Sequence, residues 1–464
     1  MARILIVAND VVASRMAGPG IRCFELARQL RIAGHLVTVA GIEASDLVTS
    51  RVVMVPQLSA GGMDRLAGEQ DAVLLEGFAL VRYPRLRDLQ VPVIVDLYDP
   101  FPLALLQQEA HRPMAERGAE TVRVRRALID LLERGDFFLC ASERQRDLWT
   151  GTLLSAGRIN PKTWDADSSL RALIDVVPFG VSDAPSPPRE QSSRAAMGPQ
   201  VSEDDLVLLW GGGIYNWFDP LTLIKAVAAL APDLPRLKLV FMSMTHPQPG
   251  VPHRMWMPAR ARELSDQLGV TGEHVVFHEG WVPYDERGGW LAAADAGIST
   301  HFDHAETRYA FRTRMLDYLW AGLPIICTDG DFFADLVRDR DLGWVVPAED
   351  ERALAAAIRA LAQAGPELAA IRGNVRRVGA EMTWSHAAVP LLRFCAALRR
   401  APDLPLVRSG QTVRGSSSGS LPGARVELLR KGWRSLRAEG PAVTARKVTR
   451  WWSERSRCRE RSKP

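Results

Sequence analysis

The amino-acid sequence predicts an α/β protein built from two parallel-sheet domains, and three observations lead to that fold class. Short apolar runs alternate with helical stretches, which is typical of parallel sheets. The alternation occurs twice, on either side of a segment at 183–204 that is rich in Ser, Pro and charge, so this segment is a predicted linker. With 464 residues, 47% of them apolar and 24% charged, the chain is long enough for two or three domains.

The first series of elements predicts a domain over residues 1–182. Its strands end in polar residues, and ligands gather at the carboxyl ends of parallel strands. Asp96 and Asp99, in VDLYDP, are therefore candidate site residues, although Asp is also a common turn residue. The predicted strands are RILIVAN (3–9), HLVTVAG (35–41), DAVLLEG (71–77), VPVIVDLYD (91–99), DFFLCASE (136–143) and IDVVPFGV (174–181).

A glycine-containing loop, AGPGIR, precedes the first predicted helix. Gly18 and Gly20 allow a ligand to approach the backbone at the helix start, but they also suit a turn that needs glycine for its dihedral angles. The dinucleotide pattern G-x-G-x-x-G is not met, because Cys23 stands at its third position. The sequence therefore disfavours a hydride-transfer enzyme.

The second series predicts a domain over residues 205–384. LVLLWGGG reads as a strand and a glycine loop, in which Gly212 and Gly213 let backbone N–H groups approach a diphosphate. Further helices are predicted at 351–364 and 366–400. The other predicted strands are LKLVFMSM, HVVFHEG, the strand at 325–327 and the edge strand GWVVP.

Residues 306–331 gather polar groups, a helix start and a buried strand. Thr313 is predicted to cap a helix that Gly322 ends in a left-handed conformation. Arg312 and Arg314 lie at the helix start, where the helix dipole favours an anion, and Asp317 follows one turn later. These residues suit a nucleotide, whose phosphate groups would bind the arginines and whose ribose would bind Asp317. The alternative is an amphipathic helix with a solvated charged face.

Within this stretch, LDYLWAGLPII resembles the donor-site segment of glycosyltransferase family 4, where a Glu, seven residues and a second Glu precede a helix ending in Ala-Gly-x-Pro. The N-terminal loop, IDVVPFGV and GWVPYDER (280–287) resemble other segments of that family, so the resemblance covers about residues 1–400. It implies a GT-B fold, with two Rossmann-like domains facing a cleft and a helix at 385–400 that packs back on the first domain.

The resemblance also implies roles for single residues. Asp317 takes the place of the second Glu, which holds the ribose hydroxyls. The first Glu falls on Tyr309, unless Glu306 reaches the donor sugar through a loop of different shape. Val282 falls where the backbone meets the nucleobase. Asp99 falls where the family commonly has a His on the acceptor side.

The diphosphate is assigned to Arg312 and Arg314, because IYNWFDP replaces the segment where the family usually has an Arg and a Lys. Trp217 in that segment is either a stacking platform or a packing residue. The run from His301 through His304 to Glu306 could hold a metal, but the resemblance implies a metal-independent enzyme, so no cofactor is expected.

The tail at 405–464 is strongly basic. It has 15 Lys or Arg against 4 Glu, a net charge of +11, which leaves −7 for residues 1–404 of a chain whose formal net charge is +4. Leu and Trp residues between the basic ones favour an anionic membrane surface over nucleic acid, and a disordered solvating tail is the alternative. We expect a cytoplasmic protein, because the chain begins directly with a strand and lacks an apolar run of about 18 residues. A peripheral location on the inner face of the cell membrane is the expectation if the tail binds lipid.

The resemblance to family 4 implies a retaining glycosyltransferase of the hexosyltransferase type. It would move a sugar from a nucleotide-sugar donor to a saccharide or lipid-linked acceptor, in bacterial-type polysaccharide or glycoconjugate synthesis. Two alternatives stay open, a non-catalytic sugar-nucleotide-binding scaffold and a GT-B sugar-nucleotide epimerase.

Overall fold

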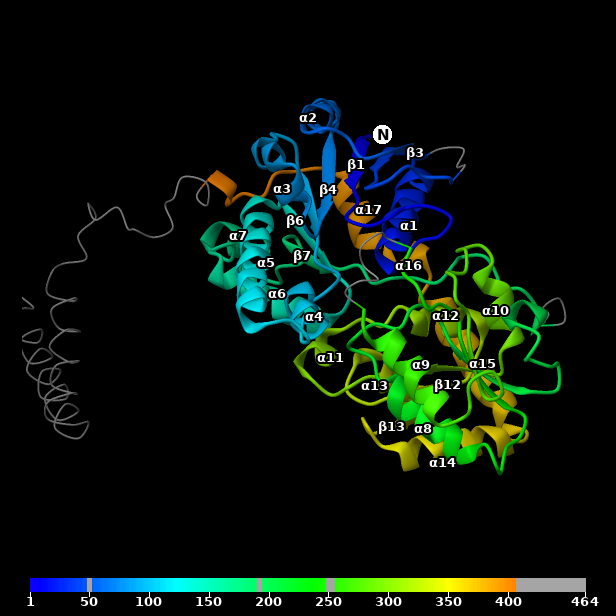
Figure 1. Cartoon of the computed structure of the whole chain (residues 1–464). Coiled ribbons are helices and arrows are strands. Elements are labelled where there is room, and N and C mark those ends of the chain that lie inside the picture. Colours follow the sequence, from blue (N-terminus) through cyan, green and yellow to red (C-terminus); the bar gives the residue numbers. More distant parts are fainter. Residues whose placement is uncertain (48–51, 190–193, 248–254, 406–464) are drawn as a thin grey trace, which may run out of the picture. The chain divides into compact units, whose positions relative to one another are not determined.

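Two parallel sheets organise the chain, and the computed structural model describes residues 1–47, 52–189, 194–247 and 255–405. Residues 1–405 form one compact unit, which contains both sheets (Figure 1). The fold class predicted from the sequence is confirmed. The basic tail, apart from Pro405, lies outside the described residues. Among the helices that the structure describes, none has the length and apolar character needed to cross a bilayer.

The first sheet has seven strands in the order β3-β2-β1-β4-β5-β6-β7, all parallel. The central strands are apolar and buried along nearly their whole length because helices cover both faces. β3 was not among the predicted strands, although its four residues are all apolar. The strands are β1 (Arg3–Val7), β2 (Leu36–Ala40), β3 (Val52–Val55), β4 (Ala72–Glu76), β5 (Val93–Asp96), β6 (Phe137–Cys140) and β7 (Ile174–Val176).

Some helices around this sheet begin at residues that favour a helix N-terminus. Pro19 occupies the first turn of α1, and the Ser142 hydroxyl accepts a hydrogen bond from the backbone N–H of Gln145 (3.2 Å) at the start of α6. We call the first sheet and its helices the N-terminal lobe. The helices are α1 (Gly18–Ile32), α2 (Ala60–Gly68), α3 (Ala79–Arg82), η1 (Pro84–Asp88), α4 (Phe101–Gln108), α5 (Met114–Arg134), α6 (Glu143–Ser155) and α7 (Pro161–Ala166).

The second sheet has six parallel strands in the order β10-β9-β8-β11-β12-β13, so β13 is an edge strand as predicted. With its helices it forms the C-terminal lobe. Its strands are β8 (Leu206–Trp210), β9 (Leu237–Phe241), β10 (Val275–Phe277), β11 (Ala296–Ser299), β12 (Ile325–Thr328) and β13 (Gly343–Val346). Its helices are η3 (Arg194–Met197), α8 (Pro220–Leu230), α9 (Met257–Gln267), α10 (Arg287–Ala293), α11 (Ala305–Tyr309), α12 (Arg314–Ala321), α13 (Phe332–Asp339), α14 (Glu351–Gln363) and α15 (Glu367–Glu381).

After α15 the chain returns to the N-terminal lobe through α16 (Trp384–Ala387) and α17 (Val389–Ala396), drawn in orange beside the blue elements of Figure 1. The helix predicted over 366–400 is therefore interrupted, because the backbone of Thr383 is extended and pairs with Val181. Phe394 of α17 stacks on Phe137 of β6, with ring centroids 4.6 Å apart. The linker predicted at 183–204 contains the short helix η3.

Candidate active site

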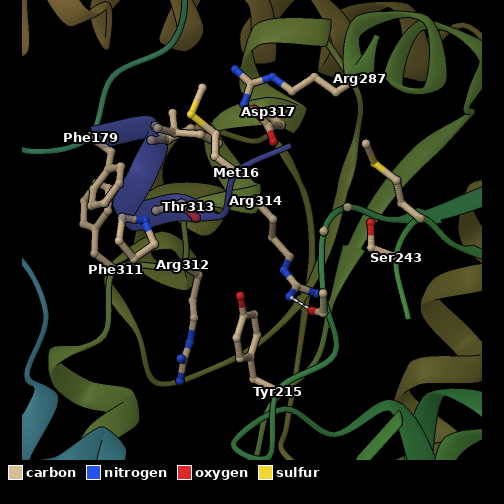
Figure 2. Close-up of a pocket in the computed structure, with 18 of the residues that line it drawn as sticks. Met16, Phe179, Tyr215, Ser243, Arg287, Phe311, Arg312, Thr313, Arg314 and Asp317 are labelled. Carbon is tan, nitrogen blue, oxygen red and sulfur yellow. Dashed lines mark hydrogen bonds and ion pairs between the residues drawn. The ribbon is translucent and has the colours of Figure 1, made fainter. Parts of the chain in front are cut away.

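A cavity of about 270 Å³ is formed by loops that follow the strands of both sheets. Tyr98 and Asp99 follow β5 on one side, and the glycines after β8 and Met242 after β9 lie on the other. The carboxyl ends of both sheets thus meet at one site, as expected of open parallel sheets. Figure 2 shows the side chains that converge there. Nine predicted site residues line the cavity, namely Gly18, Asp99, Gly212, Gly213, Val282, Glu306, Arg312, Arg314 and Asp317.

Gly20 and Tyr309 do not line the cavity. A Cβ atom at Gly20 would lie 2.0 Å from the carbonyl oxygen of Val11, so glycine is required there for packing against the backbone. Tyr309 is half-buried at the end of α11, and its carbonyl oxygen accepts a hydrogen bond from Gln145 Nε2 (2.8 Å). Of the two residues considered for the first acidic position, only Glu306 reaches the cavity.

The start of α12 differs from the prediction at Thr313. Its side chain makes no capping hydrogen bond, so that prediction was wrong. The N–H groups that it would cap are already satisfied, because Met315 donates to the carbonyl oxygen of Arg312 and Leu316 to that of Thr313, both at 3.0 Å. Thr313 instead lines the cavity beside Gly18. At the other end, Gly322 has a φ of 68° and ends the helix in the left-handed conformation, as predicted.

Arg314 supplies a buried cation to the cavity. Its Nη2 donates to the carbonyl oxygen of Gly213 (2.7 Å), and its guanidinium lies 3.9 Å from the ring centroid of Phe218 and 4.4 Å from that of Trp210. In Figure 2 the side chain extends toward Tyr215. Burial lowers the pKa of Arg314 to about 10, so the group stays protonated at neutral pH. Within the described residues its Nη1 has no hydrogen-bond partner.

Arg312 is engaged differently from Arg314. It forms a two-point ion pair with Glu306, with Nη1 3.0 Å from Oε1 and Nη2 2.7 Å from Oε2, and both side chains are buried. Both guanidinium groups lie over the ring of Phe218, that of Arg312 at 5.0 Å from the ring centroid and that of Arg314 at 3.9 Å. Arg312 is occupied by Glu306, whereas Arg314 is the arginine that bonds to the glycine loop.

Asp99 brings a carboxyl group from the N-terminal lobe to the same cavity. Burial and, to a lesser extent, the negative charge of Glu306 raise its pKa to about 7, and Arg312 opposes both effects. A carboxyl group that titrates near neutrality can accept or donate a proton at a bound hydroxyl group. Asp96 has a structural position instead, because it is fully buried in an ion pair with Arg22 (Oδ2 to Nε, 2.6 Å).

Asp317 is paired with a residue that the sequence analysis missed. Its Oδ1 lies 3.2 Å from Arg287 Nη1, and both side chains line the cavity (Figure 2). The Arg287 guanidinium lies over the ring of Tyr284, whose hydroxyl donates to Glu25 of α1 (2.9 Å). Burial raises the pKa of Asp317, and Arg287 counteracts this shift. No sequence spacing links residues 30 positions apart, so only the fold reveals the pair.

Two aromatic contacts complete the site. Tyr318 is fully buried, and its hydroxyl accepts from the backbone N–H of Gly211 (2.8 Å), which fixes the start of the glycine loop. Its place four residues after Arg314, on the same helix face, was a signal available in the sequence. Trp217 lines the cavity and stacks on Tyr215, with centroids 4.9 Å apart and rings inclined by 7°.

Comparisons with known proteins agree with this architecture. The model of the family "Glycosyl transferases group 1" matches residues 205–364. Residues 205–364 thus resemble a group 1 glycosyltransferase domain. A D-inositol 3-phosphate glycosyltransferase of Nocardioides sp. is 28% identical over 230 residues, which are 48% of this chain and 48% of that protein. The chain thus matches about half the length of such curated relatives, and the resemblance to glycosyltransferases is confirmed.

Solved structures share the fold of the glycosyltransferase domain together with that of the N-terminal lobe. Anabaena Alr3699/HepE, solved in complex with UDP and glucose, has a TM-score of 0.61 at 13% identity, over 86% of this chain and 100% of that one. Sucrose-phosphate synthase from Thermosynechococcus elongatus has a TM-score of 0.59 at 16% identity, over 85% of this chain and 98% of that one. The GT-B architecture predicted from the sequence is confirmed.

Proposed function

We propose that this protein transfers a sugar from a nucleotide-sugar donor to a hydroxyl group of a saccharide or lipid-linked acceptor, with retention at the anomeric carbon. The bond between the anomeric carbon and the diphosphate oxygen breaks, a bond to the acceptor oxygen forms, and the acceptor hydroxyl loses its proton. The resemblance to family 4 supports retention, and the glycosyltransferase domain at 205–364 supports a nucleotide-sugar donor.

The observation that best supports the proposal is the position of the Arg314 guanidinium. It is buried at the glycine loop, permanently charged, and has one nitrogen without a hydrogen-bond partner in the described part of the chain. Negative charge grows on the departing diphosphate, and a preorganised cation in a water-poor site stabilises that charge more in the transition state than in the ground state. Neutral loop N–H groups at Gly212 and Gly213 would add to the effect.

In this proposal the acceptor meets Asp99 and the donor ribose meets Asp317. The ribose hydroxyls would have to share Asp317 with Arg287 or displace it, because that ion pair occupies one carboxylate oxygen. In this proposal Glu306, whose charge is balanced by its two-point pair with Arg312, meets the donor sugar in the role that the family resemblance gives to the first acid. We assign no nucleophile and no metal.

The test is to incubate the purified protein with a panel of nucleotide sugars and candidate acceptors, and to follow release of the nucleoside diphosphate. Arg314→Gln should lower turnover by about 10²–10³-fold, the scale seen when one transition-state donor is removed, and Arg314→Lys should recover part of it. Arg340→Gln, which removes an exposed pair with Glu381, is the matched control and should retain wild-type turnover. Tight nucleotide binding without turnover on any donor would instead favour a non-catalytic sugar-nucleotide-binding protein.

We also propose that the basic tail at 406–464 attaches the enzyme to an anionic membrane surface, on the basis of its charge and its interleaved Leu and Trp residues. The full-length protein should sediment with vesicles that contain anionic lipid, and less so at high salt. A chain ending at Pro405 should not sediment. Equal sedimentation of the two would contradict the attachment.

A further inference from the structure

The amide group of Gln145 connects the two lobes at the cavity. Gln145 lies in the first turn of α6 and is fully buried. Its Nε2 donates to two carbonyl oxygens, that of Tyr98 in the N-terminal lobe and that of Tyr309 in the C-terminal lobe, both at 2.8 Å. Its Oε1 accepts from the backbone N–H of Ala141 (2.8 Å), so both N–H bonds and one oxygen lone pair of the amide are used.

Both carbonyl groups belong to segments that carry cavity carboxyl groups. Tyr98 directly precedes Asp99, and Tyr309 ends α11, the short helix whose second residue is Glu306. A single side chain therefore fixes the backbone of each segment relative to the other. Because a glutamine amide is short and rigid, a shift of either segment by about 1 Å would break one of the two bonds.

Arg144, the residue before Gln145, also connects the N-terminal lobe to the C-terminal lobe. Arg144 forms an ion pair with Asp335 of α13, and its Nη1 donates to the carbonyl oxygen of Gly330 (3.3 Å). We call Arg144 and Gln145 the α6 clamp. Both residues project from one turn of a helix in the N-terminal lobe and reach the C-terminal lobe.

We propose that the α6 clamp is a positioning device of the active site, which holds Asp99 beside Glu306 when the lobes are together. Arg312, which is paired with Glu306, offsets part of the repulsion between the two carboxyl groups, and the rest must be opposed by contacts that hold the lobes together. The hydrogen bonds of Gln145 supply such contacts where the two segments face each other. This inference rests on the proposed function for its catalytic consequence, but not for the contact itself.

The raised pKa of Asp99 agrees with this arrangement, because the charge of Glu306 contributes to it. If the clamp is loosened, Asp99 becomes less buried, which removes the largest cause of its raised pKa, and the opposing charges of Glu306 and Arg312 move away together. The Asp99 pKa should then move toward its ordinary value, and the part of the pH profile of turnover that reports Asp99 should move to lower pH.

The experiment compares the wild type with Gln145→Leu, which removes all three hydrogen bonds at similar volume. Gln70→Leu is the matched control, because Gln70 is also buried in the N-terminal lobe but its side-chain amide donates locally, to the carbonyl oxygen of Leu66 (2.9 Å) near the end of α2. Hydrogen–deuterium exchange is measured for peptides covering 98–104 and 305–311, and turnover and nucleotide affinity are measured on the same preparations.

We expect faster exchange of both peptides in Gln145→Leu, a fall in kcat of about tenfold or more, and a nucleotide Kd within about twofold of wild type, since the nucleotide is held mainly by the C-terminal lobe. Gln70→Leu should change none of these. Unchanged exchange, or faster exchange with wild-type kcat, would overturn the proposal. If Gln145→Leu does not fold, Arg144→Gln decides by the same measurements, because Arg144 is partly exposed.

Failure of the proposed function would be seen separately. If the wild type turns over no nucleotide sugar, the exchange comparison still shows whether the clamp holds the two segments. If the wild type is active and exchange is unchanged in both clamp variants, the clamp is wrong and the proposed function stands.

Discussion

Replacing Tyr318 by Phe should weaken the glycine loop while leaving the core packed. The ring fills the space beside Gly297, where a Cβ atom would lie 2.2 Å from Tyr318 Cγ, and this ring is retained in the variant. Only the hydroxyl oxygen is lost, and with it the partner of the Gly211 N–H at 2.8 Å. The same hydroxyl lies 3.0 Å from the carbonyl oxygen of Leu209 and 2.9 Å from that of Ile298, so it joins β8 to β11.

A buried N–H left without a partner costs about 1–3 kcal/mol, so the free energy of unfolding should fall by that amount. Nucleotide binding should weaken as well, because Gly211 begins the loop at the proposed diphosphate position. Each 1.4 kcal/mol lost to reordering the loop raises the dissociation constant about tenfold. Urea unfolding gives the first quantity and titration calorimetry with a nucleoside diphosphate gives the second.

The control is Tyr83→Phe, which removes a hydroxyl from a similarly buried tyrosine that donates to the carbonyl oxygen of Leu58 (3.2 Å), away from the cavity. It should lower stability by a similar amount without changing nucleotide affinity. If Tyr318→Phe unfolds and binds nucleotide like the wild type, the hydroxyl does not hold the loop and the reasoning is refuted.

Three further predictions concern the cavity and its surroundings. Gly20→Ala should lower the free energy of unfolding by about 1–3 kcal/mol, because the new methyl group would press on the Val11 carbonyl oxygen, and a wild-type melting temperature would disprove this. Asp99 has its pKa raised by folding to about 7, so its contribution to stability is complete below about pH 4 and is lost as the pH rises through 7. Asp99→Asn should therefore gain stability relative to the wild type between about pH 5 and pH 8, whereas parallel melting curves would count against the shift. Asp317→Asn should weaken nucleoside diphosphate binding by about 1–3 kcal/mol in calorimetry, and an equal loss in Arg287→Met would show that the intact ion pair is what binds.

Local patterns predicted much of this fold, because they depend on near neighbours in the chain. The helix in LDYLWAGLPII, its left-handed end at Gly322 and the strand after it follow from apolar spacing and glycine chemistry. The cap at Thr313 was predicted wrongly, because backbone hydrogen bonds from the preceding turn already satisfy the N–H groups concerned.

Contacts between distant segments were beyond the reach of such patterns. Most predicted site residues meet at the cavity because loops after parallel strands share one edge of a sheet. The partners of these residues depend on the packing of both lobes. The ion pair of Arg287 with Asp317 and the hydrogen bonds of Gln145 to two backbone segments produce no periodic pattern in the sequence. Gly20 resembled a ligand-binding glycine, but glycine is required there because a neighbouring carbonyl oxygen leaves no room for a side chain.

The chain passes between the lobes twice in its described part, and the two passages are bonded to each other. The N–H of Val181 donates to the carbonyl oxygen of Met382 (2.8 Å), and the N–H of Trp384 donates to the carbonyl oxygen of Val181 (3.0 Å). A Cβ atom at Gly180 would lie 2.5 Å from the backbone nitrogen of Trp384, so the two backbones are in direct contact.

Because the two connecting segments are hydrogen-bonded to each other at one point, they act as a single hinge. The lobes therefore have little freedom to twist or slide relative to each other. Rotation about this hinge is the movement that remains, and it would change the width of the cavity. Trp384 and Gly180 also line the cavity, so the hinge is part of the cavity wall. A ligand that fills the cavity therefore touches the hinge itself.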